Sequence, residues 1–181
     1  MWDNRYLGDI GNKALVTLDG TDMPVEMKFS EKFMSHKFKG NRLKYEVGVC
    51  IATGHVVWVH GPTRAGQNNI TLARQAFVSF LNDDEMAVVD SGYRGEFHSI
   101  KTPNKVHFCS GLEFYNAAVA QARHETVNSR FKNNQVLVKH FRHSLAFHSA
   151  CFRAVAVVSQ LIIENGEPLI DVQYSDEGRK V

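Results

Sequence analysis

Through the first third of the chain, apolar residues alternate with polar ones or run in short blocks, which is the pattern of β-strands. Residues 14–18 form an apolar run that ends at Asp19-Gly20, so we expect a buried strand closed by a turn there. Residues 45–51 alternate, and the pattern resumes at residues 57–59 beyond a Thr-Gly turn. This predicts a β-hairpin that ends where Gly61-Pro62 interrupts the pattern.

Farther along, residues 86–89 form a second short apolar run, which ends at Asp90 before a glycine turn. Helical spacing of apolar positions predicts three helices, over residues 70–81, about 112–133 and about 144–165. Asn68 or Asn69 is the expected N-cap of the first helix, and the pattern also allows a short strand at residues 169–172. The order strand, two strands, helix, strand, helix, helix is typical of an α/β domain with a mixed sheet flanked by helices.

Composition is that of a globular protein, with 181 residues, 44% hydrophobic and 22% charged. This length fits one domain. No apolar run approaches 18 residues and no signal peptide is evident, so we expect no membrane association and no secretion. The three cysteines, Cys50, Cys109 and Cys151, are odd in number, widely spaced and outside CxxC pairs. This favours a reduced, intracellular protein without a disulfide framework.

Charge is unevenly distributed although the net charge is only +2. Basic residues dominate segments 28–44 and 121–153, whereas acidic residues gather at 82–85 and after Glu164. Such a separation is compatible with a surface that binds a polyanion. It is equally compatible with an ordinary solvated surface, and charge alone leaves both interpretations open.

Two aspartates occupy matching positions, because Asp19 and Asp90 each end an apolar strand. If the two strands are neighbours, about 4.8 Å apart, their carboxylates converge at one edge of the sheet. The alternative for each is a turn aspartate that binds its own backbone, which is the commoner role of an Asp-Gly pair.

A third acid, Glu125, lies on an otherwise basic helix. At 100° per residue the buried stripe of that helix comprises Ala117, Ala120, His124, Val127 and Phe131. Beside this stripe runs a polar line made of Gln121, Glu125, Asn128 and Lys132. Glu125 therefore faces along the edge of the sheet, which favours a site over an ordinary surface charge.

Three converging carboxylates need a cation. At an effective dielectric of ~20, each pair about 5 Å apart repels by roughly 3 kcal/mol. Oxygen ligands select Mg²⁺ or Mn²⁺. Two such ions, about 4 Å apart, can activate a water or 3′-hydroxyl and stabilise the leaving oxygen in phosphodiester chemistry.

Three segments, "LDGTDMPV", "VVDSGYRGE" and "ARHETVNSRFK", resemble in order the three acidic motifs of the DDE superfamily of transposase endonucleases. The likeness is to the Harbinger-type transposases and their domesticated nuclease relatives. Asp90 and Glu125 have 34 residues between them, close to the interval in many DDE enzymes. The likeness covers about residues 14–172, after a short lead at 1–13 and before an acidic tail at 173–181. It implies an RNase H-like fold, a mixed sheet of about five strands with helices on both faces.

The resemblance assigns Asp19, Asp90 and Glu125 as the catalytic, metal-binding triad. Asp22 is near the first motif, but on a strand that continues past Gly20 it faces oppositely to Asp19, so Asp19 is preferred. The spacing from Glu125 to Lys132 resembles the Glu-x6-Lys feature of bacterial insertion-sequence transposases, where the lysine contacts DNA. The arginine that those enzymes carry four residues before the glutamate is Gln121 here. The expected DNA-binding residues are Arg123, Arg130, Lys132 and Lys139.

Two features depart from the family. Relatives often carry Asp where this chain has Asn69, so an accessory acid is lost or a helix cap is exchanged. Relatives also carry a helical DNA-recognition region ahead of the nuclease domain, whereas the first motif here begins about thirteen residues from Met1. We therefore expect the catalytic half alone, a nuclear location, a homo-oligomer or a separate Myb-like or helix-turn-helix recognition protein as partner, and DNA as substrate.

Other chemistry-bearing residues receive less specific interpretations. His140, His143 and His148 lack a nearby Cys or carboxylate, so phosphate contact or surface placement is preferred to a zinc site. A set of phenylalanines is expected to belong to the core rather than to stack on bases: Phe114, Phe131, Phe141, Phe147 and Phe152.

The sequence thus predicts a divalent-metal-dependent DNA endonuclease. The direct alternative is a catalytically silent, transposase-derived remnant that binds DNA or a protein partner. A third interpretation, an intracellular scaffold without a nucleic-acid role, predicts neither a metal response nor salt-dependent DNA binding.

Overall fold

The computed structural model describes residues 1–7, 14–28, 30–83, 85–94, 100–101 and 111–172. Its centre is a mixed sheet of five strands in the order β4-β3-β1-β5-β6, and the two-residue β2 extends it by pairing with the start of β3. β1 pairs antiparallel with β3 and parallel with β5. The strands have these bounds: β1 Ala14–Pro24, β2 Met34–Ser35, β3 Gly40–Cys50, β4 Val56–Arg64, β5 Met86–Val89 and β6 Ile100–Lys101.

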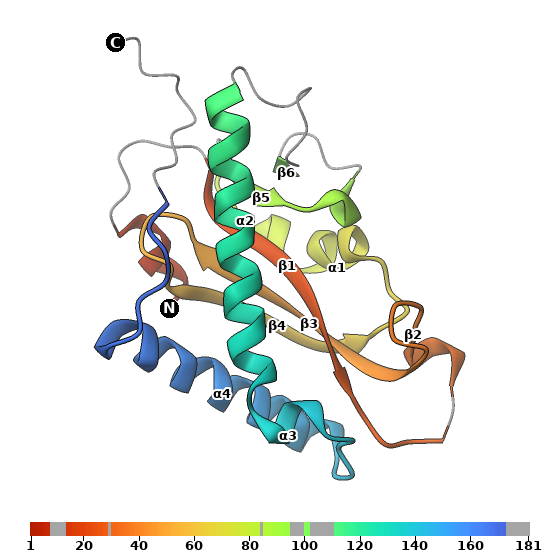
Figure 1. Ribbon diagram of the computed structural model, residues 1–181. Helices are drawn as coiled ribbons and strands as arrows, with labels where there is room; N and C mark the ends of the chain where they lie inside the picture. Colours follow the sequence, from red (N-terminus) through yellow and green to blue (C-terminus); the bar gives the residue numbers. More distant parts are fainter. Residues whose placement is uncertain (8–13, 29, 84, 95–99, 102–110, 173–181) are drawn as a thin grey trace, which may run out of the picture.

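Helices cover both faces of the sheet. One face carries α2 (Gly111–Lys132), α3 (Gln135–Val138) and α4 (Leu145–Asn165), with α2 running across β1 (Figure 1). The other face carries α1 (Asn69–Gln75) with the 3-10 helices η1 (Trp2–Tyr6) and η3 (Phe77–Phe80). The short 3-10 helices η2 (Glu31–Phe33) and η4 (Ser91–Tyr93) complete the described elements. The predicted α/β fold, a mixed five-stranded sheet flanked by helices, is confirmed and is consistent with an RNase H-like arrangement.

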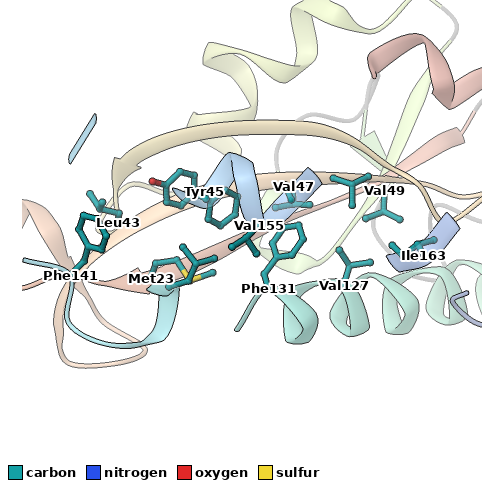
Figure 2. Packing of buried hydrophobic residues seen from close by; sticks show 14 of the residues in the cluster. Met23, Leu43, Tyr45, Val47, Val49, Val127, Phe131, Phe141, Val155 and Ile163 are labelled. Atoms are coloured by element: carbon teal, nitrogen blue, oxygen red, sulfur yellow. The ribbon is translucent and has the colours of Figure 1, made fainter. Parts of the chain in front are cut away.

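The larger core lies between the sheet and the long helices. Figure 2 shows Val127 and Phe131 of α2 against Val47 and Val49 of β3, with Ile163 of α4 beside them. The predicted helices near residues 112–133 and 144–165 are confirmed, because both carry apolar stripes over several turns. Every residue of the predicted stripe on α2 is buried.

Both predicted strand ends in the first half are wrong. β1 does not turn at Asp19-Gly20 but continues to Pro24, with Gly20 paired to Glu46 of β3. Gly20 serves a close approach instead, since a Cβ there would lie 3.0 Å from Oδ1 of Asn69. β4 continues through Gly61-Pro62 to Arg64, because its pairing with β3 shifts register there and absorbs the irregularity.

The first predicted helix divides, and the last predicted strand is absent. α1 ends at Gln75, because the next residue, Ala76, has a φ of −137° and a ψ of −65°, which are not helical, and η3 follows. Asn68 holds the N-cap position without a side-chain capping bond. Residues 169–172 have no regular structure, although Leu169 packs into the core.

Residues 1–7 of the short N-terminal lead pack against the body of the fold. Trp2 makes edge-to-face contacts with Trp58 and Phe77, at ring-centroid distances of 5.5 and 5.6 Å. Arg5 forms a buried ion pair with Glu85, with Nε 2.7 Å from Oε1. The predicted acidic tail at 173–181 lies outside the described residues.

α4 is long and apolar enough to cross a membrane, judged by length and composition alone, with a mean hydropathy of 1.5. The expectation of no transmembrane helix stays a prediction. One side of α4, including Phe152 and Ile163, packs into the core. A core helix passes the same test, so the finding does not distinguish the two placements.

Candidate active site

The predicted acids meet at a cleft of about 350 Å³. Asp19 comes from the middle of β1, Asp90 directly follows β5, and Glu125 lies on α2, and all three line the cleft. The parallel pairing of β1 with β5 brings the two aspartates together, as the sequence predicts. The cleft thus gathers acids from segments that are 71 and 35 residues apart along the chain.

Asp19 is the most constrained of the three. Its Oδ1 accepts a hydrogen bond from the Gly20 N–H at 2.7 Å, and its Oδ2 accepts one from Nδ2 of Asn128 at 2.8 Å. Burial, together with the charges of the Asp90 and Glu125 carboxylates, raises the pKa of Asp19 from 3.8 to about 7. The charges of Asp90 and Glu125 therefore lie close enough to Asp19 to disfavour its charged form.

Asp90 lies at the start of η4 and is exposed. Its Oδ1 accepts a hydrogen bond from the Gly92 N–H at 2.8 Å, which fixes the carboxylate against the turn. Gly92 is needed for this close packing, since a Cβ there would lie 3.0 Å from the same oxygen and 3.2 Å from Nδ2 of Asn69.

Glu125 occupies the predicted polar line on α2. Glu125, Asn128 and Lys132 all line the cleft, and Gln121 lines an adjoining cavity of about 250 Å³ that Glu125 also borders. The charge of Lys132 lowers the pKa of Asp19, against the effect of burial. The helical spacing therefore did predict which side chains of α2 face the site.

Of the four basic residues expected to bind DNA, Lys132 lies at the cleft, whereas Arg123 is buried inside the protein. Lys132 lines the cleft, and Lys139 is exposed at the end of α3. Arg130 donates to the Glu167 carbonyl at 2.7 Å. Arg123 is buried, only 2% exposed, and cannot reach a phosphate, so its assignment to DNA binding is wrong.

Arg123 instead joins α2 to the end of β3. Its guanidinium donates hydrogen bonds to the carbonyls of Cys50 and Ile51, with a longer contact to that of Ile170. Burial lowers its pKa. Helix periodicity places residue 123 next to the buried stripe, and a buried arginine is held by such carbonyl acceptors.

The sequence analysis missed Lys44 of β3 as a residue of the site, and it also missed Glu46, a buried charge two residues farther along the same strand. Lys44 is 8% exposed and donates from Nζ to Oδ1 of Asn69 at 2.8 Å and to the Gln67 carbonyl at 2.7 Å. Glu46 is fully buried, and burial raises its pKa to about 8. The available signal was that Lys44 and Glu46 alternate with apolar residues in a strand that lies inside the sheet.

Asn69, where relatives often carry Asp, turns its side chain into the cleft rather than capping α1. Its bond from Lys44 replaces the charge pair that an aspartate would make there. Asp22, the strand partner of Lys44, also lines the cleft, although alternation along β1 gives it the face opposite to Asp19. It accepts a hydrogen bond from Oγ of Ser35 at 2.6 Å.

The histidine and phenylalanine expectations need two corrections. His148 is buried, with Nδ1 2.7 Å from the Tyr45 hydroxyl, so surface placement is wrong for it, whereas His140 and His143 are exposed. Phe147 is 52% exposed and does not belong to the core. The core placement holds for Phe131, Phe141 and Phe152, and the side chain of Phe114 lies outside the described part.

The donor set suits a hard cation in its chemistry, because its members are carboxylate and amide oxygens. Within the described part of the chain, Oδ1 of Asn128 is buried and has no hydrogen-bond partner. The same part contains no group of three or more His, Cys, Asp or Glu side chains arranged to hold a metal.

Comparison with known proteins adds no identification: no family model, no curated protein and no solved structure matches the chain.

Proposed function

We propose that this protein is a divalent-metal-dependent endonuclease that cuts DNA phosphodiester bonds. The observation that carries the proposal is the convergence of Asp19, Asp90 and Glu125 on one cleft that Lys132 also lines. Because burial already disfavours the charged form of Asp19, a cation would relieve a penalty that the fold otherwise bears. This is the arrangement that the DDE resemblance implies.

Each residue has a distinct role in the proposal. Asp19, Asp90 and Glu125 would hold Mg²⁺ or Mn²⁺, and two such ions when bound supply an activated water or 3′-hydroxyl and stabilise the leaving oxygen. Lys132 attracts the DNA phosphate toward the acids by its charge. Asn128 holds the Asp19 carboxylate in place by its hydrogen bond. The same proposal gives the protein DNA as its substrate, a nuclear location and a separate recognition protein as partner.

A second candidate is a protein that binds DNA without cutting it. It is favoured by the hydrogen bonds that satisfy Asp19 without a cation, from Gly20 and Asn128. It is also favoured by Asn69, which removes an acid that relatives often carry. In this case Lys132 would serve phosphate contact alone.

The experiment combines a melting curve with a cleavage assay. Millimolar Mn²⁺ should raise the melting temperature of the unmutated protein, because a ligand that binds the folded state stabilises it. The same ion should support nicking of supercoiled DNA, which EDTA abolishes. Asp19→Asn and Asp90→Asn should lose both responses, whereas neutralising Asp22 should cost much less.

Three outcomes separate the candidates. Stabilisation together with nicking supports the endonuclease. Salt-dependent DNA binding without nicking in either Mg²⁺ or Mn²⁺, even with a recognition domain supplied, supports the second candidate. Neither a metal response nor DNA binding supports the scaffold.

A further inference from the structure

The cleft extends beyond the acids to a turn that neither the motifs nor the proposed chemistry uses. Residues 36–39 form this turn between β2 and β3, and His36, Lys37 and Phe38 line the cleft together with the carboxylates. The acidic and aromatic ends therefore belong to one continuous space of about 350 Å³.

The turn is held in place from several sides. The Ser35 hydroxyl donates to Asp22 of β1, and the Lys39 N–H donates to the Ser35 carbonyl at 2.8 Å. Lys39 adopts a left-handed φ of 51°, which closes the turn. Because these contacts are already made, Phe38 is presented without an ordering step at the moment of binding.

Phe38 is a flat ring at the mouth of a polar cleft, 40% exposed. The Arg42 guanidinium lies over this ring at 4.1 Å from its centroid, and Nζ of Lys37 is 5.5 Å from it. Aromatic rings combined with cations of this kind stack nucleic-acid bases and hold the adjoining phosphates. Phe38 is apolar and only partly buried, so stacking of a base would remove more of its ring from water.

The size of the cleft limits what can enter it. A space of about 350 Å³ lies near the lower limit for pockets that hold a single small molecule. It suits one nucleotide unit rather than two paired strands. A base can stack on a side chain only after it leaves its own pair and its neighbours in the duplex.

We propose that Phe38, backed by Arg42, is a stacking platform for one unpaired base of the DNA strand whose phosphate lies at the acids. The substrate class is therefore DNA with a single-stranded or frayed segment at the cleavage point. The assignment of the neighbouring phosphate rests on the proposed endonuclease function, whereas base stacking itself does not. Lys37 and Lys132, which both line the cleft, hold the flanking phosphates.

The test measures binding in EDTA, so that it does not depend on cleavage. Fluorescence anisotropy compares a labelled oligothymidylate of about twenty nucleotides with a duplex of the same length. The unmutated protein should bind the single strand more tightly than the duplex. Phe38→Ala should weaken single-strand binding at least about five-fold, the size of one lost base stack, and change duplex binding less than about two-fold.

Phe147 offers a matched control, because it is also exposed but lies on α4 outside the cleft. Phe147→Ala should leave single-strand binding unchanged. In a second arm, oligothymidylate should quench the added tryptophan emission of Phe38→Trp but not that of Phe147→Trp. Circular dichroism confirms that each variant is folded.

Equal single-strand binding by Phe38→Ala and the unmutated protein would overturn the platform, as would unquenched emission from Phe38→Trp. These results are separable from failure of the endonuclease. If Phe38 shows no stacking but the protein cuts DNA in a reaction that requires Glu125, the platform alone is rejected. If Phe38 stacks a base but the protein does not cut DNA, the endonuclease alone is rejected.

Discussion

The side-chain amide of Asn128 donates a hydrogen bond to Oδ2 of Asp19 over 2.8 Å, which joins α2 to β1 inside the cleft. Among the described residues, the oxygen of the same amide has no partner although it is buried. A neutral donor at this point stabilises the charged form of Asp19 without a cation. The hydrogen bond from Asn128 therefore stabilises the site when no cation is bound.

Asn128→Asp should make the protein depend on a cation. The substitution removes the donor and adds a carboxylate beside Asp19, and such a pair costs about 2–4 kcal/mol at an effective dielectric of ~20. We expect the free energy of unfolding at pH 8 without divalent ions to fall by about that amount. Denaturant titrations with and without Mn²⁺ should show a larger stabilisation by the ion than in the unmutated protein.

The control is Asn133→Asp, which places the same new charge just past the end of the same helix, at an exposed position. It should cost less than about 1 kcal/mol, with no gain in the response to Mn²⁺. Equal stability of the two variants would show that position 128 is not in the electrostatic environment of Asp19.

Glu46 predicts a specific pH dependence of stability. Burial raises its pKa from 4.5 to about 8, although Trp58 and Tyr93 donate hydrogen bonds to its carboxylate. The folded protein therefore holds a proton that the unfolded chain releases near pH 4.5. The stability that this proton contributes is complete below pH 4.5 and is lost as the pH rises through about 8.

In Glu46→Gln the free energy of unfolding should fall less between pH 4.5 and 9 than in the unmutated protein, by a few kcal/mol at most. The reason is that glutamine resembles the protonated acid in shape and carries no charge at any of these pH values. The measurement is the free energy of unfolding at intervals from pH 4.5 to 9. Glu31→Gln changes an exposed glutamate and serves as control. Parallel curves for Glu46→Gln and the unmutated protein would contradict the buried, protonated state.

Arg123→Ala should unfold the protein more easily without weakening DNA binding by the folded fraction. It removes donors from the carbonyls of Cys50 and Ile51 and leaves a gap beside them, so about 2–4 kcal/mol should be lost. Arg142→Ala, at an exposed ion pair with Glu26, should cost less than about 1 kcal/mol. Unchanged stability with weaker DNA binding would restore Arg123 to the DNA surface.

Lys132→Ala should weaken DNA binding by similar factors for unrelated sequences. The slope of log affinity against log salt should decrease by about one, because one phosphate contact is lost. Lys139→Ala measures in the same titration whether the exposed end of α3 belongs to that surface. A loss confined to one sequence would show that Lys132 reads bases instead.

The long helices and the acids could be predicted because each depends on local pattern. The stripe on α2, from Ala117 to Phe131, repeats over about four turns, and this identifies both the helix and the side on which Glu125 lies. Asp90 ends its strand as predicted, since only four apolar residues precede it. Asp19 was assigned correctly to the cleft although the expected turn at Asp19-Gly20 does not exist. Alternation along β1 gives Asp19 the same face whether the strand ends there or continues.

The remainder of the site depends on contacts between distant segments. Lys44 binds Asn69, and Ser35 binds Asp22, across pairings that only the folded sheet creates. Helix periodicity predicted that Lys132 lies outside the buried stripe of α2. It did not show that Arg123 is buried against a carbonyl of β3. Sequence patterns report which face a residue occupies, whereas its partner depends on tertiary packing.

The measurement that tests the central claim most directly is nicking of supercoiled DNA by Glu125→Gln in Mn²⁺. This substitution keeps the shape and helix propensity of the residue and removes the charge that a metal requires. We predict that nicking disappears while the melting temperature without divalent ions does not fall, and that Asp19→Asn combined with Glu125→Gln loses little more. Glu164→Gln, an exposed position on α4, should cut as well as the unmutated protein. Undiminished nicking by Glu125→Gln would contradict the account, because Glu125 would then be an ordinary surface charge.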